Sequence, residues 1–490
     1  MAGPVQGNMG GGGRRIARNA AMRAGGELIG KLASMVFFIA IARELGESGF
    51  GDFVFALSLT SILVLASGFG TEELLAREVA RDHGRIHGYL ANVAAVKLVL
   101  SVALLLVAAA IVNLGDWPAD ARAAVYIVGI GVAFENLGRT WHSVFTAYER
   151  LEMISVSLVI QRTLTAAVGI AVLLMGGGLI AVSIVFSVGA LVGFLIATQV
   201  LRRYVVAPRW ELDRARWMPL LKAGVPIGMA ALLFTILMRV DATLLGLLTG
   251  GEDNSEVGIY GAAYRLVEAT LFISWAFGAS ALPWFSRQSS DANVLRGYEF
   301  GLKAITSVLT PIGLGLVLLA EPVIDLLYGP DYSEAVLPLR LLGTVAILYG
   351  INSFASTLLI SRDRPHDFTR MALVVSVVNV VMNIILIPEY GADGTAFTAA
   401  VSAVLMAVIS VTLAGHRFGR VGVIRAFGAP LVGGVAMTGV VLATGLPLVP
   451  AAILGVAAYA VGLLAFERLA FPDDLARMRS LVTRRRGALA

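Results

Sequence analysis

Residues 226–250 read PIGMAALLFTILMRVDATLLGLLTG, and residues 257–285 read VGIYGAAYRLVEATLFISWAFGASALPWF. Each stretch is long enough to cross a bilayer as a helix, since about 20 apolar residues span the hydrocarbon core. Each also contains an arginine, Arg239 in the first and Arg265 in the second, with a carboxylate close by in sequence. A charge at mid-bilayer costs about 2.5–3.5 kcal/mol on insertion scales, so such residues usually face a bundle interior or a watery cavity. The two stretches therefore predict a membrane bundle whose charges mark a path across it.

The composition supports a membrane protein. The chain has 490 residues, of which 58% are hydrophobic and 14% are charged, and its mean hydropathy is +0.82. Soluble domains are about 45–50% apolar and about 25% charged. The apolar residues come in blocks of helix length, whereas a transmembrane barrel would alternate apolar and polar residues over segments of about 10. The sequence therefore predicts an all-α integral membrane protein.

The apolar blocks predict about fourteen membrane spans. The eleventh and twelfth are separated only by EYGADG (389–394), which leaves thirteen as an alternative. The predicted spans are about 19–42, 50–70, 88–113, 123–145, 154–175, 179–201, 219–248, 257–284, 302–320, 336–360, 369–388, 393–414, 424–444 and 447–467.

Two short matches predict an internal repeat. Phe50-Gly51 recurs as Tyr260-Gly261, and the glycine that starts 178–181 recurs at the start of 391–394, at offsets of 210 and 213 residues. Two six-helix lobes around a cavity would produce this repeat, and their common axis would run along the membrane normal. The predicted segments are a disordered leader (1–15), a first lobe (16–201), a cytoplasmic linker (202–218), a second lobe (219–414), two extra helices (415–467) and a basic cytoplasmic tail (468–490).

Basic residues predict the orientation. Arginine and lysine fall in alternate connections, among them 14–23, 77–85 and the linker 202–218, whereas the intervening loops are acidic. Cytoplasmic loops carry the excess of basic residues in membrane proteins. We therefore expect a multi-pass protein of the cell membrane with both termini in the cytoplasm. The net charge of +5 is explained by this placement and does not indicate a nucleic-acid partner.

Three parts of the chain resemble a known family. They are ARELGESGFGDFVFALSL (42–59) with GFGTEELLAREVAR (68–81), LLKAGVPIGMAALLFTILMRVDATLLG (220–246) with VGIYGAAYRL (257–266), and VVNVVMNIILIPEYGADGTAFTAAVS (377–402). In this order and spacing they resemble the polysaccharide-biosynthesis transporters. These are the oligosaccharide flippases of the multidrug/oligosaccharidyl-lipid/polysaccharide exporter superfamily.

The resemblance implies two six-helix lobes whose central cavity opens alternately to each side of the membrane. It implies a polyprenyl-diphosphate-linked glycan as the substrate, moved from the cytoplasmic to the outer leaflet, with membrane lipids and the polysaccharide assembly machinery as partners. The chain departs from the multidrug branch because its first helix offers no acidic cation site beyond Glu27. It departs from the lipid II flippases because it lacks an evident arginine-rich pattern in its early helices.

The cations inside the predicted spans suit an anionic substrate. Guanidinium groups bind phosphate oxygens bidentately and stay charged at any working pH. We expect a central cradle for the diphosphate in which a lysine adds a point charge, and alanine at Arg239 or Arg265 should abolish transport. The predicted substrate-binding residues are Arg239, Arg265, Arg162, Arg139 and Lys31.

The carboxylates near these cations leave two interpretations open. They either tune the cradle and bind a coupling proton or Na⁺, or they neutralise the cations structurally. Glu135 and Arg139 lie four apart, which is ion-pair spacing on a helix, and Arg265 with Glu268 invites the same interpretation. The predicted coupling or tuning residues are Asp241, Glu268, Glu27 and Glu135. Asn379 and Asn383 are expected to hydrogen-bond a neighbouring helix.

Two other functions remain as alternatives. A cation-coupled multidrug exporter of the same fold would need a carboxylate site and a less cationic cavity. A membrane glycosyltransferase or polymerase would need large extramembrane loops with paired carboxylates, and the loops here are short. The sequence contains no P-loop, nucleophile elbow or HExxH pattern and no cysteine, so we predict no catalytic residue, no cofactor and no metal site.

Overall fold

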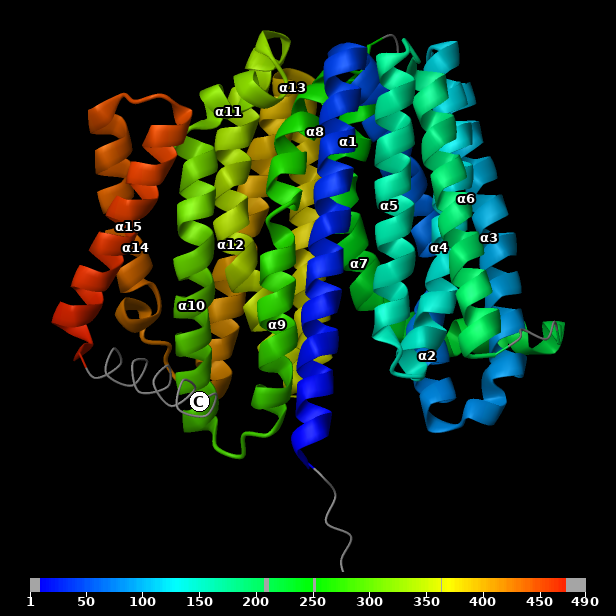
Figure 1. The fold of residues 1–490 in the computed structure, drawn as a ribbon, viewed down its shortest axis with the longest axis horizontal. Helices are drawn as coiled ribbons and strands as arrows, with labels where there is room; N and C mark the ends of the chain where they lie inside the picture. Colours follow the sequence, from blue (N-terminus) through cyan, green and yellow to red (C-terminus); the bar gives the residue numbers. More distant parts are fainter. Residues whose placement is uncertain (1–8, 207–210, 250–252, 363, 473–490) are drawn as a thin grey trace, which may run out of the picture. The chain divides into compact units, whose positions relative to one another are not determined.

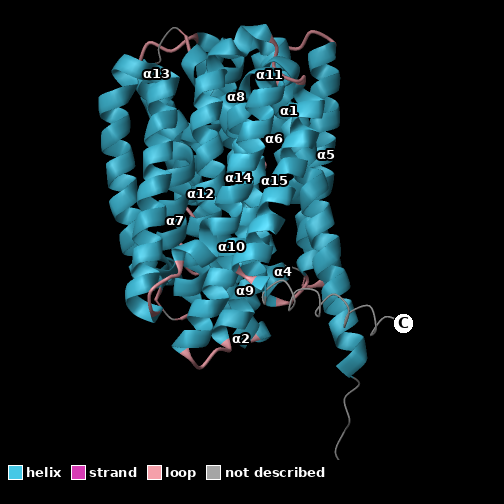
Figure 2. Ribbon diagram, turned by 90° about the vertical axis from the view of Figure 1, so that its left-hand side faces the viewer, coloured by secondary structure: helices cyan, strands magenta, loops and turns pink. Residues whose placement is uncertain are grey.

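A computed structural model describes residues 9–206, 211–249, 253–362 and 364–472. Within these ranges the regular elements are all helices and there is no strand, which confirms the predicted all-α fold class (Figure 2). Ten of the described helical segments are long and apolar enough to cross a membrane. The contacts divide the chain into two compact units, Met1–Gly261 and Ala262–Ala490.

The first unit contains the early helices, and α4 packs along α6 while α1 packs along α5. Figure 1 follows these helices from blue to green. Their bounds are α1 Met9–Ala66, α2 Thr71–Arg81, α3 Ile86–Leu114, α4 Ala119–Ala147, α5 Leu151–Leu174, α6 Leu179–Tyr204 and α7 Trp217–Thr249, with short 3-10 turns η1 His83–Arg85 and η2 Arg214–Arg216. Helix α8, Ser255–Glu268, crosses the boundary between the units.

The second unit contains the remaining helices, in which α12 packs along α13 and α10 packs along α12. Their bounds are α9 Leu271–Ser286, α10 Asp291–Leu318, α11 Ala320–Leu327, the 3-10 turn η3 Pro330–Ala335, α12 Val336–Ser361, α13 Pro365–Phe418, α14 Val423–Thr444 and α15 Leu448–Ala470.

Two of the long helices are each two helices joined at a glycine. The backbone leaves the helical conformation at Gly46 in α1, where φ is 69°, and at Gly391 in α13, where φ is 49°. Both values lie in the left-handed region that side chains disfavour and glycine adopts readily. These glycines lie between the first and second and between the eleventh and twelfth predicted spans. The total of fourteen spans stays a prediction.

The second predicted span ends in a turn at residues 67–70, here called the helix break. Phe69 has φ 39° and Gly70 has φ 69°, and α2 begins at Thr71. A Cβ atom on Gly70 would lie 2.3 Å from both the carbonyl oxygen of Gly224 and the amide nitrogen of Gly228 in α7. Glycine is required here by both the φ angle and the close approach of two backbones. The predicted span 50–70 therefore ends at the break, and α2 follows it as a separate helix.

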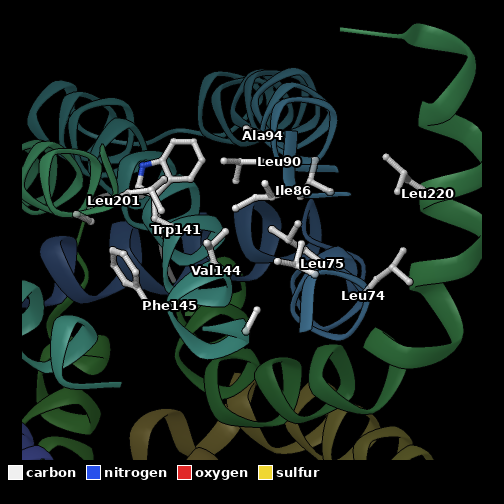
Figure 3. Packing of buried hydrophobic residues seen from close by; sticks show 14 residues of the cluster. Leu74, Leu75, Ile86, Leu90, Ala94, Trp141, Val144, Phe145, Leu201 and Leu220 are labelled. Carbon is white, nitrogen blue, oxygen red and sulfur yellow. The ribbon is translucent and has the colours of Figure 1, made fainter. Parts of the chain in front are cut away.

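The core of the first unit lies beside this break. Leu74 and Leu75 of α2 pack with Ile86 of α3, Trp141 of α4 and Leu220 of α7, together with other buried apolar residues (Figure 3). The Nε1 of Trp141 donates to the hydroxyl of Thr198 in α6 at 2.8 Å, so its one polar atom is satisfied. Apolar burial thus holds α2 against α3 and α4, and the polar groups described below fix its first turn.

The eighth predicted span is confirmed as the membrane-span candidate Ser255–Ser286, but it consists of two helices. The structure ends α8 at Glu268 and begins α9 at Leu271. The hydroxyl of Thr270 donates to the carbonyl of Val267 at 2.8 Å, and the amide of Thr270 donates to the same carbonyl at 2.9 Å. A threonine side chain that bonds nearby backbone competes with the regular helix ladder, and the sequence pattern of apolar residues does not reveal this competition.

The ends of the chain differ in part from the prediction. Residues 1–8 and 473–490 lie outside the described residues. Helix α1 already begins at Met9, so the leader predicted as disordered over 1–15 is helical from that residue. Adding a residue to an existing helix forms one backbone hydrogen bond, so a long helix can extend into a segment of poor helix propensity.

The last two helices pack on each other and on α10 within the second unit (Figure 1). One carboxylate oxygen of Glu299 in α10 accepts a hydrogen bond from the amide of Gly422, next to the start of α14, at 2.6 Å. One turn further along α10, Lys303 forms an ion pair with Glu467 of α15 at 2.9 Å. These polar contacts fix the two additional helices to one helix of the unit.

Candidate functional site

Two of the predicted cradle arginines have no carboxylate within ion-pair distance among the described side chains. Arg162 lies near the middle of α5 and is half-buried, with its Cδ 3.2 Å from the Cβ position of Gly30 in α1. Arg139 lies on α4 and is exposed. An uncompensated charge on a membrane helix is expensive in lipid, so these guanidinium groups are suited to a polar ligand or a watery cavity.

Glu135 does not neutralise Arg139. Its carboxylate oxygen Oε1 accepts a hydrogen bond from Nε2 of Gln161 at 2.8 Å, which ties α4 to α5. The side chains of Glu135 and Arg139 have suitable sequence spacing, yet they form no ion pair with each other in the structure. Arg139 instead attracts Glu72 of α2 electrostatically from beyond ion-pair distance.

Arg265 differs because a carboxylate on its own helix compensates it. Its Nη1 donates to Oε2 of Glu268 at 2.5 Å, one turn further along α8. Only 8% of the Arg265 side chain is exposed, whereas 31% of Glu268 is exposed. The structural interpretation of these two residues as an ion pair therefore describes their geometry, and Arg265 is a weaker candidate for phosphate than Arg162.

The charges of α7 lie close to the first unit's other helices. Asp241 is buried, and its Oδ2 accepts a hydrogen bond from the hydroxyl of Tyr260 in α8 at 3.1 Å. Arg239 is half-buried, and its backbone carbonyl accepts the hydroxyl of Thr243. Lys31 is half-buried on α1, while the side chain of Glu27 lies outside the described residues. The predicted cradle cations are thus distributed over five different helices, α1, α4, α5, α7 and α8.

A buried polar cluster that the sequence analysis missed lies at the helix break. The ammonium of Lys97 in α3 donates to Oε1 of Glu72 at 2.5 Å and to the backbone carbonyl of Asn136 in α4 at 2.6 Å. The amide nitrogen Nδ2 of Asn136 donates to the carbonyl of Val64 at 3.1 Å and to the hydroxyl of Ser67 at 2.8 Å. Two helices, α3 and α4, thus contact the chain on both sides of the helix break through polar side chains.

A signal for this cluster was present in the sequence. Lys97 is the single charged residue inside the apolar span 88–113, and Glu72 follows directly after the glycine-containing run GFGT (68–71). A charge inside an apolar span requires a partner or water. The partners are 25 and 39 residues away in the chain, so no local spacing could have identified them.

An apolar groove of about 1000 Å³ lies in the second unit. It is lined by residues of α10, α12, α13 and α14, including Thr310, Ile351, Val411 and Leu431. Leu431 and Val435 of α14 are 64% and 73% exposed. The groove offers few polar groups, so it suits a hydrocarbon chain rather than a sugar or a phosphate.

Asn379 of α13 contacts the other half of the same helix. The Nδ2 of Asn379 donates to the hydroxyl of Ser402 at 3.3 Å, across the turn at Gly391. The Nδ2 of Asn383 donates to Oδ1 of Asn379 at 3.2 Å. The prediction that these side chains bond a neighbouring membrane helix is confirmed for Asn379.

Comparison with solved structures supports the fold. The chain is similar to the lipid II flippase MurJ in an inward closed conformation, with a TM-score of 0.78 and 16% identity over 91% of this chain and 99% of that one. It is also similar to an inward-facing multidrug resistance MATE family transporter of the MOP superfamily, with a TM-score of 0.64 and 15% identity over 81% and 98% of the two chains. The chain therefore shares the fold of these two proteins.

Curated relatives match over part of the chain. The probable low-salt glycan biosynthesis flippase Agl15 of Haloferax volcanii is 24% identical over 166 residues, which is 33% of this chain and 34% of that protein. The probable flippase AglR of the same organism is 26% identical over 213 residues, 42% and 44% of the two chains. The chain thus spans less than half the length of these relatives.

One protein family matches more than half of the chain. Residues 16–289 match the family described as polysaccharide biosynthesis protein. This match includes Lys97, Glu72, Arg139, Arg162 and Arg239, so it covers the whole set of first-unit charges described above. Because the match extends over more than half of the residues, the chain belongs to the polysaccharide biosynthesis protein family.

Proposed function

We propose that this protein is a transporter that flips a polyprenyl-diphosphate-linked oligosaccharide from the cytoplasmic to the outer leaflet by alternating access. The observation that carries the proposal is the pair of membrane-helix arginines Arg139 and Arg162, which have no ion-pair partner among the described side chains. Family membership and relatives named as flippases support it. A diphosphate is the kind of group that would use both guanidinium charges.

The apolar groove supplies a second reason for a lipid-linked substrate. A polyprenyl chain needs an apolar surface while its charged headgroup crosses the membrane, and the groove beside α14 offers one. We propose that the headgroup is held by guanidinium groups and that the chain remains in hydrocarbon or in this groove. Binding a charged group at mid-membrane lowers the barrier because protein dipoles and charges replace part of its hydration.

We also propose the finer organisation that the sequence predicts. Lobes 16–201 and 219–414 would rock about a central site, with both termini in the cytoplasm of the cell. The basic residues of connections such as 202–218 support this orientation. The polysaccharide assembly machinery would remove the flipped glycan on the outer side, and this removal or an ion gradient would drive transport.

A cation-coupled multidrug exporter is the second candidate, favoured by the similarity of the fold to a MATE transporter. That function would need carboxylates at the site rather than guanidinium groups. Asp241 and Glu135 already accept hydrogen bonds from Tyr260 and Gln161, which leaves less of their capacity for a ligand. The sign of the charge that transport requires therefore distinguishes the two candidates.

The first experiment is conditional depletion in the native host, followed by extraction of lipid-linked sugars and a test of which leaflet holds them. We expect a diphosphate-linked glycan to accumulate on the cytoplasmic face. Unchanged lipid-linked sugars together with new sensitivity to cationic drugs would reject the flippase and favour the exporter.

The second experiment tests the arginines in the depleted strain. Arg162→Ala should abolish glycan export, and Arg162→Lys should restore part of it, because lysine keeps the charge but loses the bidentate geometry. Arg202→Ala is the matched control, since Arg202 is an exposed arginine in the last turn of α6. Normal export by Arg162→Ala, at a normal protein level in the membrane, would remove the anion site from the proposal.

A further inference from the structure

The two sides of the helix break are held by different kinds of polar contact. On the α1 side, the neutral side chain of Asn136 binds the carbonyl of Val64 and the hydroxyl of Ser67. On the α2 side, the first turn is held to α3 by the ion pair between Glu72 and Lys97. A change of charge would therefore release the α2 side and leave the α1 side in place.

Lys97 depends on Glu72 for its charge compensation. Its side chain is 0% exposed, and the acceptors of its ammonium are the Glu72 carboxylate and the Asn136 carbonyl. A buried ion that loses its partner is strongly unfavourable, because desolvation is no longer offset by attraction. The arrangement is stable only while the Glu72 carboxylate is ionised.

Glu72 is accessible where Lys97 is not. The side chain of Glu72 is 22% exposed, so one edge of the carboxylate can exchange protons with water. Arg139 is exposed and attracts Glu72 from beyond ion-pair distance. Within the pair, Lys97 is therefore shielded from water and Glu72 is in contact with it.

Charged and titratable groups face the pair from the elements that pack against α2. Helix α7 meets the break through Gly224 and Gly228, which carry no charge. On the far end of α2, Glu78 forms an ion pair with Arg85 of η1 at 3.1 Å. The groups that interact electrostatically with the pair are Glu73 on α2 and Arg139 and His142 on α4, whereas His83 and Arg85 of η1 lie at the far end of α2.

We propose that the Lys97–Glu72 pair is a proton-sensitive latch that holds α2 against α3 and α4, and that a proton bound by Glu72 releases α2. The backbone at the break is already non-helical at Phe69 and Gly70, so α2 can move about this point without breaking further helix hydrogen bonds. A carboxylate that must be ionised in the latched state binds a proton more readily in the released state.

The sign of the pH dependence follows from this difference in bound protons. The latched state binds one proton fewer than the released state, so acid favours release. A single proton changes the ratio of the two states by at most about tenfold per pH unit. The latch would be closed at neutral pH and would open as the pH falls.

The test uses the absence of cysteine from the chain, which allows single reporter thiols. Val79 lies on α2 with no exposed surface, and its neighbour Ala80 is exposed. The labelling rate of Val79→Cys by a maleimide in nanodiscs, divided by the rate of Ala80→Cys at the same pH, reports release of α2 and removes the intrinsic pH dependence of the thiol. We expect this ratio to rise several-fold from about pH 6 to about pH 4, because a free glutamate binds its proton near about pH 4.3 and only there do the two states differ in bound protons.

Variants of the latch give distinct expected patterns. Glu72→Gln imitates the protonated carboxyl, so the ratio should be high and independent of pH. The double variant Lys97→Met with Glu72→Gln has no buried charge, so the ratio should be low and independent of pH, and this variant also serves if the single variant does not fold. The control variant Lys303→Met with Glu467→Gln removes the ion pair between α10 and α15. With Lys97 and Glu72 intact, its labelling ratio should rise on acidification as in the parent reporters.

Three results would overturn the latch: a flat pH profile in the parent reporter, a pH response that persists in the Lys97/Glu72 double variant, or loss of the response in His142→Gln. The last result would assign the proton to His142 instead. The labelling measurement requires no transport and no substrate. A failure of the latch therefore leaves the proposed flippase untouched, and the depletion experiment can fail without affecting the latch.

Discussion

An ion pair between a lysine and a glutamate ties membrane helices together in each unit, and the two pairs have different surroundings. In the first unit, Lys97 is fully buried and Glu72 is partly open, next to a backbone with positive φ angles. In the second unit, Lys303 and Glu467 are 12% and 8% exposed, at the end of α15. The proposed switch and the clamp thus differ in which partner water can reach.

Two glycines with positive φ angles, Gly70 before α2 and Gly445 at the other end of α15 from Glu467, give a second contrast. Gly70 has φ 69° and its Cβ position lies 2.3 Å from the backbone of α7. Gly445, between α14 and α15, has φ 55° and nothing within 4 Å of its Cβ position. The first glycine is constrained by conformation and packing together, and the second by conformation alone. Substitutions at the pairs and at the turns test this difference, beginning with the largest expected effect.

Gly70→Ala should lower the free energy of unfolding by about 4 kcal/mol, as the sum of a left-handed φ penalty and overpacking against backbone. The added methyl cannot be accommodated by rotation of a side chain, because its neighbours are the carbonyl of Gly224 and the amide of Gly228. Denaturant titration in mixed micelles measures the change. A loss no larger than that of Gly445→Ala would show that α7 does not constrain the break.

Glu72→Gln should lower the free energy of unfolding by about 3 kcal/mol, because it leaves the Lys97 ammonium buried without a carboxylate. The value is at the low end for a buried pair since Glu72 is partly exposed. The double variant with Lys97→Met should recover most of the loss, because apolar residues replace a buried ion pair at little cost. The same titration compares them, and no recovery would contradict the assignment of the pair.

Lys303→Met should have a smaller effect, about 2 kcal/mol, the usual contribution of a hydrogen bond to a charged group. The Lys303 ammonium contacts both oxygens of Glu467, at 2.9 and 3.1 Å, and lies 5.0 Å from the centre of the Phe471 ring. Limited proteolysis after α15 should become faster while the pH profile of Val79→Cys labelling stays the same. A changed profile would mean that the two pairs are coupled.

Gly445→Ala should have the smallest effect, about 1 kcal/mol, because only the left-handed φ angle disfavours alanine there. Thermal unfolding of the detergent-solubilised protein checks the value against the unmodified chain. A loss as large as that of Gly70→Ala would indicate a contact at the corner between α14 and α15 that the open space around Gly445 does not suggest.

The cations show how far sequence reasoning reached. The arginines of the predicted spans could be found because charges are rare in apolar segments. Sequence spacing predicted equally that Arg139 and Arg265 each form an ion pair with a carboxylate on their own helix. In the structure only Arg265 of these two does so. Glu135 instead accepts a hydrogen bond from Gln161 on another helix. The spacing of residues within either helix does not predict a contact between the two helices.

Hydropathy could not predict the helix break for a related reason. A window of apolar residues identifies a span but does not register that Phe69 and Gly70 adopt positive φ angles. A glycine by itself is no signal for a break, because glycine is common in membrane helices. The role of Gly70 depends on Gly224 and Gly228, about 150 residues further along the chain, which bring a second backbone against it.

Composition and the order of motifs were enough to predict the all-helical membrane fold and the family, because both depend on local sequence. Tertiary structure decided which charges are compensated. Lys97 forms an ion pair with Glu72, and Glu135 accepts a hydrogen bond from Gln161. Arg162 has no carboxylate within ion-pair distance among the described side chains. The physical reason is that a buried charge is stabilised by whichever polar group folding brings within about 3 Å, and that distance is not a function of separation along the chain.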